Sequence, residues 1–130
     1  MELPAGPTGS VHPRRGEIWF VRLPTDPPEK QGRPVVVVSI EARNQHPRAN
    51  TILIVPMSTT LRDSPTHMPL KPGETGLAEE VDLQAENITT VRKSALHAPR
   101  TKLRRLSETQ LRQITHRVVL ALGFIPETIT

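Results

Sequence analysis

The sequence contains no cysteine and very few aromatic residues. Without cysteine, the chain can form no disulfide bond, no thiolate nucleophile and no zinc–sulfur site, which is compatible with a reducing compartment. The aromatic residues are Trp19, Phe20 and Phe124, too few for a row of rings that stack on successive bases of a single strand. No apolar run approaches the length of a membrane span, and the N-terminus lacks the charged-then-apolar pattern of a signal peptide. We therefore expect a cytoplasmic protein with no membrane partner.

The residues that are present indicate a small basic domain. The chain has 130 residues, of which 35% are apolar and 14 are proline, and its formal net charge is +4. This length allows one domain, and the positive charge favours a polyanionic partner such as nucleic acid, or an acidic protein. Residues 1–13 are rich in proline and glycine, so we expect a flexible N-terminal tail before a single domain over residues 14–126. The histidines have no metal-ligand spacing, and we expect no metal and no other cofactor.

The stretch GRPVVVVS at residues 32–39 predicts the central strand. Four consecutive valines favour a strand, and an unbroken apolar run indicates that both faces of the strand are covered. Pro34 fixes its own φ angle and biases Arg33 toward an extended conformation, so the guanidinium starts from a defined point. A permanently charged planar fork on a rigid strand is suited to holding a phosphate. The alternative is a solvated arginine at the end of a loop.

The rest of the chain predicts a small, mostly antiparallel sheet. Further strands are expected at residues 17–23, 51–55, 66–70, 81–83 and 88–91. Pro56 and Met57 close the strand at 51–55, and Pro69 is tolerated only if the strand at 66–70 lies at the edge of the sheet. Residues 41–50 are polar, with one helical turn. The expected architecture is a twisted sheet or open barrel.

One C-terminal helix is predicted from its capping residues. Ser107 is the N-cap and Gln110 follows three residues later, which is a capping box, while Gly123 ends the helix. The apolar face of this helix is expected to consist of Leu111, Ile114, Val118 and Leu122. The helix therefore has a structural role, with one face packed on the sheet.

Seven short motifs follow one another along the chain. They are RGEIW at residues 15–19, GRPVVVV at 32–38, IVPMST at 54–59, PTH at 65–67, ETGL at 74–77, ENITTV at 86–91 and KSAL at 93–96. Each motif is weak alone, but the ordered set, over residues 14–122, resembles the MazF/PemK/Kid family of toxin endoribonucleases. The resemblance implies an SH3-like barrel of the MazF/PemK/CcdB type with a C-terminal helix. It also implies a homodimer that cleaves single-stranded RNA at short sequence motifs without a metal and is held inactive by a cognate antitoxin.

The resemblance also implies roles for individual residues. Arg33 falls on the family's catalytic arginine, and Ser58 falls where the family usually has its catalytic threonine, with Thr59 beside it. Glu86 aligns with an acidic residue implicated as a base in one branch of the family. That branch also uses a histidine in the loop before the central strand and an arginine two residues before the acid. Here the loop has no histidine and Gln84 stands at the latter position, so the acid–base scheme of that branch does not transfer whole.

The implied reaction assigns a chemical task to each of these groups. The 2′-hydroxyl attacks the neighbouring phosphorus and leaves a 2′,3′-cyclic phosphate and a 5′-hydroxyl. Arg33 is suited to stabilising the extra negative charge through two parallel hydrogen bonds to phosphate oxygens, but it is a poor base. Ser58 or Thr59 can donate to the same phosphate.

Two ionisable residues have open assignments. Glu86 is either a base or a contact to a base edge of the RNA, or it is a carboxylate paired with Arg92 or Lys93. His67 is either a proton-transfer or RNA-binding group, or a solvated histidine on the edge strand. Further RNA contacts are expected from Lys30, Gln31, Gln84 and Asn87, and backbone contacts from the basic run Arg100, Lys102, Arg104 and Arg105, some of which are alternatively ordinary solvated charges.

Two other functions remain open for the same fold. One is a non-enzymatic, CcdB-like toxin that binds a gyrase, for which Arg33 and the hydroxyl-rich loop at residues 58–65 would have no purpose. The other is a catalytically inactive module that binds RNA or protein, an alternative that the departures at Ser58 and Gln84 keep open. Incubation with mixed single-stranded RNA separates the enzyme from both alternatives.

Overall fold

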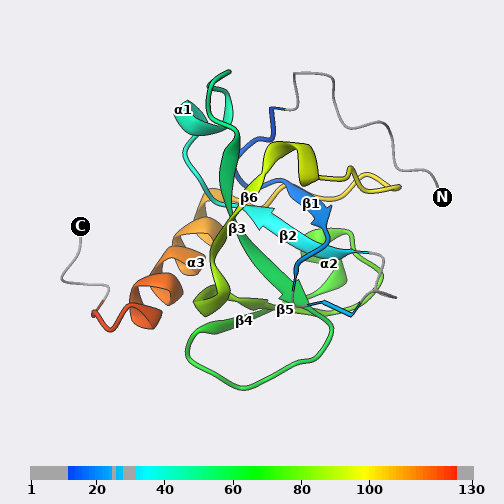
Figure 1. The fold of residues 1–130 in the computed structure, drawn as a ribbon. Coiled ribbons are helices and arrows are strands. Elements are labelled where there is room, and N and C mark those ends of the chain that lie inside the picture. Colours follow the sequence, from blue (N-terminus) through cyan, green and yellow to red (C-terminus); the bar gives the residue numbers. More distant parts are fainter. Residues whose placement is uncertain (1–11, 25, 28–31, 126–130) are drawn as a thin grey trace.

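The computed structural model places most of the chain in one continuous fold (Figure 1). It describes all residues except 1–11, 25, 28–31 and 126–130. The expected flexible tail therefore lies almost entirely outside the described residues, as do Lys30 and Gln31. Pro13, the last residue of that expected tail, is buried and its carbonyl oxygen accepts a hydrogen bond from Gln45 at 3.2 Å. No helix in the described part of the chain is long and apolar enough to span a membrane.

An antiparallel sheet forms the body of the molecule. The described strands are β1 (Ile18–Val21), β2 (Arg33–Val37), β3 (Thr51–Ser58), β4 (His67–Leu70), β5 (Val81–Gln84) and β6 (Thr89–Arg92). Their order is β1-β2-β3-β5-β4, and β6 also pairs with β3. The strands are joined or followed by helices α1 (Glu41–Asn44), α2 (Pro72–Thr75) and α3 (Glu108–Ala121) and by 3-10 turns η1 (Ala85–Asn87) and η2 (Lys93–Ala95). The prediction of a mainly antiparallel fold with a C-terminal helix is confirmed.

β3 is longer than predicted, because it continues through Pro56 and Met57 to Ser58. Its first half pairs with β6 up to Ile54, and its last residues pair with β5 from Met57 onward. Pro56 stands where one neighbouring strand replaces the other, a position at which a residue without an amide hydrogen is tolerated. The prediction that these two residues end the strand was wrong. The change of partner lets β3 join the two halves of the curved sheet.

The valines of β2 face two separate cores, as the unbroken apolar run predicts. Val36 packs in the larger core, which contains Leu111 and Ile114 of α3. Val35 and Val37 point to the opposite face and pack in the smaller core. All three valines are fully buried. The central strand therefore gives Arg33, at its first position, a rigid base.

Helix α3 begins and ends as predicted. The Ser107 side chain accepts a hydrogen bond from the Gln110 amide, and the Gln110 side chain returns one to the Ser107 amide. Gly123 follows the helix with φ at +86°, a left-handed conformation that favours glycine at this position. Leu111 and Ile114 are buried, but Leu122 is 67% exposed, so the prediction that Leu122 belongs to the packed face was wrong. The helix has turned away from the sheet by its last residue.

Candidate active site

Strand alternation places the predicted site residues on one face of the sheet. Val35 of β2 lies opposite Pro56 of β3, and continuing this register by two residues places Arg33 opposite Ser58. Ser58 in turn pairs with Asp82 of β5. Because residues directly opposite each other in an antiparallel pair point to the same face, these three polar residues share one surface. It is the face turned away from α3 and the larger core.

The guanidinium of Arg33 is fixed by two acceptors. Nη2 donates to Oδ1 of Asp26 at 2.6 Å, and Nη1 donates to Oε1 of Gln84 at 3.4 Å. The Asp26 side chain is 1% exposed, whereas that of Arg33 is 19% exposed. Asp26 itself is anchored because its other oxygen accepts from the amide of Leu23 at 3.3 Å. Arg33 is therefore a partly buried, oriented cation and not a solvated arginine at the end of a loop.

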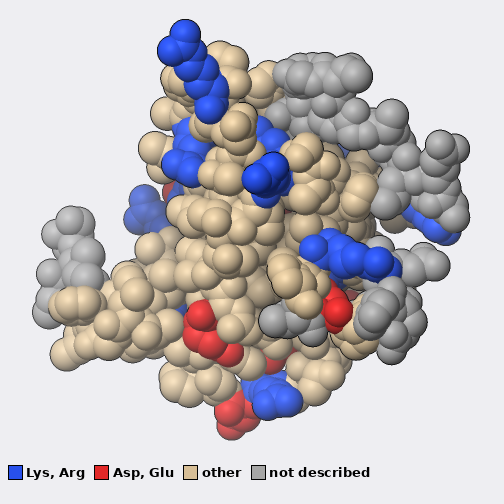
Figure 2. All heavy atoms as spheres, viewed as in Figure 1, with Lys and Arg blue, Asp and Glu red and all other residues tan. Residues whose placement is uncertain are grey.

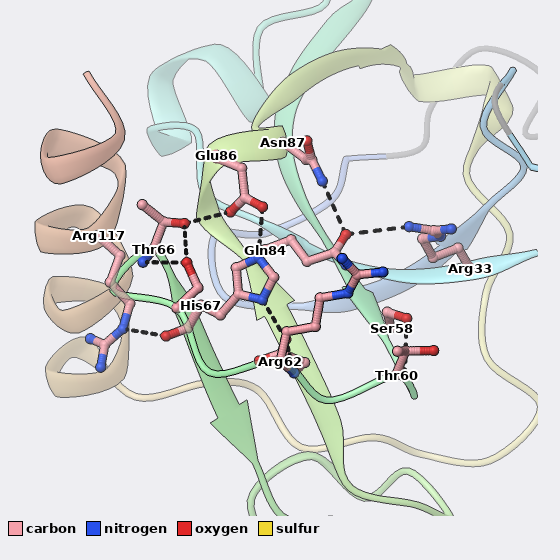
Figure 3. Close-up of polar contacts among 12 residues, drawn as sticks. Arg33, Ser58, Thr60, Arg62, Thr66, His67, Gln84, Glu86, Asn87 and Arg117 are labelled. Carbon is pink, nitrogen blue, oxygen red and sulfur yellow. Dashed lines mark hydrogen bonds and ion pairs between the residues drawn. The ribbon is translucent and has the colours of Figure 1, made fainter. Parts of the chain in front are cut away.

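Gln84 connects Arg33 to the neighbouring polar groups (Figure 3). Its Oε1 also accepts from the side-chain amide of Asn87 at 3.1 Å. Gln84 lies opposite His67 in the β4–β5 ladder, so the two side chains point to the same face. Gln84 thus places a half-buried, uncharged amide where the scheme of one family branch has an arginine.

The structure separates the two candidate hydroxyl residues. Ser58 ends β3, is partly buried and lies on the face of Arg33. Its Oγ accepts a hydrogen bond from the amide of Thr60 at 3.1 Å, so its own hydroxyl hydrogen is left to donate. Thr59 is exposed and follows the strand end. The geometry favours Ser58 over Thr59 as the donor beside Arg33.

His67 lies between two carboxylates (Figure 3). Its Nδ1 contacts Oδ2 of Asp82 at 2.5 Å, and its Nε2 contacts Oε2 of Glu86 at 2.6 Å. The other Glu86 oxygen accepts from the hydroxyl of Thr66 at 2.9 Å. The side chains of His67 and Asp82 are 6% and 1% exposed, while Glu86 is 38% exposed. Only Glu86 among these three groups therefore presents a substantial surface to a ligand.

The pKa values of this group shift in opposite directions. Burial opposes the charged form of His67, but hydrogen bonds to Glu86 and Asp82 and their negative charges outweigh it and raise the pKa of His67. Burial also opposes ionisation of Glu86, but hydrogen bonds from His67, from the Glu86 backbone and from Thr66 lower the pKa of its carboxyl group. The charged forms of His67 and Glu86 therefore coexist over a wider pH range than those of the free side chains.

Two predictions about these residues need correction. His67 does lie on an edge strand, but it is buried and not solvated, because Asp82 and Glu86 satisfy both ring nitrogens. The carboxylate of Glu86 is bound by His67 and Thr66, and neither Arg92 nor Lys93 is its partner in the described contacts. The ammonium group of Lys93 instead donates to the backbone carbonyl of His46 at 3.0 Å. The two open assignments thus concern a single network.

Part of the basic run has a structural role. Arg104 donates to the carbonyl of Gly73 at 3.1 Å, and Arg105 donates to the carbonyl of Arg15 at 2.7 Å. Both therefore tie the linker before α3 to the rest of the fold, while both side chains stay exposed and their contact with RNA stays a prediction. Arg100 and Lys102 are exposed, and their role in RNA binding stays a prediction. In Figure 2 the Lys and Arg side chains on the visible face lie mainly in its upper half and form no continuous band.

Asp26 and Asp82 are the site residues that the sequence analysis missed. Asp26 lies in a polar loop whose composition gives no sign that its carboxylate is buried. Asp82 could have been found, because the alternation Val81-Asp82-Leu83-Gln84 places a carboxylate and an amide on the same face of a buried strand. No local pattern in the sequence indicates its contact with His67.

Comparison with known proteins identifies the family of this fold and site. The sequence model of one family, the PemK-like, MazF-like toxin of type II toxin-antitoxin system, matches residues 14–122. The chain belongs to this family. A probable endoribonuclease MazF5 of Mycobacterium tuberculosis is 29% identical over 102 residues, which cover 78% of this chain and 85% of that protein.

Solved structures of MazF-like proteins have the same fold. An endoribonuclease in complex with its cognate antitoxin, from a mycobacterial species, matches with a TM-score of 0.65 at 25% identity, over 86% of this chain and 96% of that chain. MazF from Deinococcus radiodurans matches with a TM-score of 0.68 at 17% identity, over 88% of this chain and all of the other. The prediction of a MazF/PemK-type barrel is confirmed. The family match includes every residue of the network around Arg33 and His67.

Proposed function

We propose that this MazF-like chain is a sequence-selective endoribonuclease toxin that cleaves single-stranded RNA by 2′-hydroxyl attack, without a metal. The observation that carries the proposal is the orientation of Arg33 by Asp26 and Gln84 on the same face as Ser58. Family membership supports the reaction class, and the similarity to a probable endoribonuclease MazF5 supports RNA as the substrate. A guanidinium held in place before the substrate arrives needs no reorganisation as charge develops on the phosphate.

The chemistry divides among three side chains. Asp26 and Gln84 each use one N–H of Arg33, and Nε is buried without a partner, so one N–H on each of Nη1 and Nη2 is left to donate to phosphate oxygens. Ser58 donates its hydroxyl hydrogen to the same phosphate. Glu86 accepts a hydrogen bond from the 2′-hydroxyl and takes its proton as the oxygen attacks phosphorus, while the leaving 5′-oxygen takes a proton from water. The low pKa of Glu86 keeps it in the acceptor form.

The substrate test is cleavage of mixed single-stranded RNA in excess chelator. We expect discrete fragments that carry a 2′,3′-cyclic phosphate or its hydrolysis product on one side and a 5′-hydroxyl on the other. Within the described residues, no three His, Asp or Glu side chains gather in a geometry that would hold a metal ion. Loss of cleavage that magnesium restores would contradict the metal-free reaction.

A 2′-deoxy sugar at the scissile position provides the matched control. This substrate lacks only the attacking hydroxyl, so we expect it to bind and remain uncut. Cleavage of the deoxy substrate at the rate of RNA would show that the nucleophile comes from elsewhere. If neither substrate is cleaved, a gyrase-inhibition assay tests the alternative of a CcdB-like toxin.

The same proposal includes a cognate antitoxin, a cytoplasmic location and a homodimer. One related mycobacterial endoribonuclease was solved with its cognate antitoxin, which supports such a partner here. At the end of α3, apolar side chains are exposed at Leu120, Leu122, Phe124 and Ile125. An apolar surface of this kind is suited to contact with a second chain.

We expect light scattering of the active protein to give the mass of a dimer. Two-fold pairing of a small barrel extends the binding surface beyond what one domain offers, and it covers the exposed end of α3. The measurement is made at the concentration and salt used for RNA cleavage. A monomer that still cleaves RNA under those conditions would contradict the prediction.

A further inference from the structure

We infer that His67 is a positioning residue of the cleavage site, which carries a positive charge and holds Glu86 in place through a carboxylate–imidazole–carboxylate chain that begins at Asp82. This inference rests on the proposed function, because it concerns the same reaction. His67 is not a catalytic residue in this scheme. Its ring is almost fully buried and both nitrogens are already bound, so it cannot reach the RNA.

A proton on each ring nitrogen satisfies both contacts of His67 when the two carboxylates are ionised. Carboxylate oxygens lie at hydrogen-bond distance from both Nδ1 and Nε2, and an ionised carboxylate can only accept. A neutral ring would turn a lone pair toward one of the two anions. The carboxylate–imidazole–carboxylate series is anchored at both ends. At its buried end Asp82 also accepts from the backbone amide of Arg62 at 3.1 Å, and at its outer end the hydroxyl of Thr66 donates to Glu86.

The other charged groups near His67 leave this assignment intact. Asp82 comes from β5 and Glu86 from η1, and each presents a carboxyl oxygen to the ring. Arg117 of α3 donates to the carbonyl oxygen of His67 at 3.0 Å, so it fixes the backbone and does not contact the ring. Arg62, in the loop after β3, contacts Asp82 through its backbone amide. The balance of these groups agrees with the raised pKa of His67.

The series Asp82–His67–Glu86 connects the candidate catalytic residues to one another. Ser58 pairs with Asp82 across β3 and β5, and Gln84, which binds Arg33, pairs with His67 across β5 and β4. The imidazole thus fixes Glu86, whose backbone lies in a 3-10 turn at the surface, relative to both Ser58 and Arg33. A shift of about 1 Å in a reacting group can lower the rate on the order of a hundredfold. Positioning by His67 therefore has a direct effect on turnover.

The pH dependence follows from the two opposite shifts. The raised pKa of His67 contributes stability that is fully present below its unfolded-state pKa and is lost as the pH rises through the folded-state value. The lowered pKa of Glu86 contributes stability that is present above its unfolded-state pKa and is lost as the pH falls through its folded-state value. Between these limits both His67 and Glu86 are charged. On the alkaline side, deprotonation of His67 releases Glu86 and the turnover rate falls.

Two neutral substitutions of similar size separate the contact of His67 with Asp82 from its contact with Glu86. In His67→Asn the amide nitrogen takes the place of Nδ1, so it keeps Asp82 and loses Glu86. In His67→Gln the amide nitrogen takes the place of Nε2, so it keeps Glu86 and loses Asp82. We expect kcat to fall by about tenfold to a hundredfold in His67→Asn with a small change in KM, and to fall less in His67→Gln. Neither variant retains the alkaline decline of the wild type.

The protonation state is read independently of RNA cleavage. Two-bond nitrogen–proton correlation spectra of the full chain, with the His67 signal assigned by its absence in His67→Gln, should show two protonated ring nitrogens at neutral pH. A single protonated ring nitrogen would contradict the inference that His67 is positively charged. Chemical denaturation of the two variants measures how much of each rate change comes from lost folding.

The outcomes distinguish this inference from the proposed function. If the wild type cleaves RNA but His67→Asn and His67→Gln have equal kcat, or both keep the alkaline decline, the positioning role is wrong and the proposed function stands. If the wild type cleaves no RNA, the proposed function fails, and the positioning role fails with it. Loss of kcat in His67→Asn beyond that in His67→Gln, at equal stability, supports the inference.

Discussion

Replacing Arg33 with lysine should lower the rate of RNA cleavage by about a hundredfold or more while leaving the fold in place. The ammonium retains the positive charge that pairs with Asp26, so the folded state keeps its counter-ion. It lacks the planar fork that donates to Asp26 and Gln84 and that, in the proposed reaction, also donates to a phosphate. The measurement is single-turnover cleavage of a defined RNA, with circular dichroism and chemical denaturation of the same sample.

Arg43 offers the matched control for this substitution. It lies on α1 and binds the backbone and hydroxyl of Thr51, at the opposite end of β3 from Ser58. Arg43→Lys should therefore retain wild-type activity. Full activity of Arg33→Lys, or equal losses in both variants, would contradict the role of the Arg33 fork. Arg33→Ala is a less specific test, because it leaves the carboxylate of Asp26 buried without its counter-ion.

The scaffold of the site could be read from the sequence because its causes are local. A run of valines specified the strand that carries Arg33, and a capping box specified the start of α3. Both signals depend on residues that are adjacent or a few positions apart. Pro56 shows the limit of such rules, because proline alone predicts a strand end, whereas the exchange of β6 for β5 as the neighbour of β3 allows the strand to continue.

The polar network could not be read in the same way, since its contacts join distant parts of the chain. His67 binds Asp82 and Glu86, which follow it by 15 and 19 residues, and Arg33 binds Gln84 at a separation of 51. An edge strand with a histidine is usually solvated on one side. Here the 3-10 turn after β5 brings Glu86 over the ring and closes that side. Only the register of the sheet reveals that the histidine is enclosed.

Asp26 is the residue for which the structure predicts the second large effect. Its side chain is 1% exposed and its only charged partner among the described residues is Arg33. Asp26→Asn preserves the shape and one hydrogen bond but removes the charge. We expect the free energy of unfolding to fall by about 1.5 to 3 kcal/mol, the range for a hydrogen bond to a charged group. We also expect lower kcat and lower KM, because Arg33 is less well oriented but no longer neutralised by a protein carboxylate.

A double-mutant cycle between Asp26 and Arg33 tests the coupling directly. Arg33→Ala alone leaves a buried carboxylate uncompensated, and Asp26→Asn alone leaves a partly buried cation, whereas the double variant leaves neither. The double variant should therefore unfold at a denaturant concentration well above that expected from adding the two single effects. Purely additive effects on unfolding would show that the ion pair contributes no coupling. Asp26 would then have no part in orienting the guanidinium, and a drop in kcat for Asp26→Asn would need another cause.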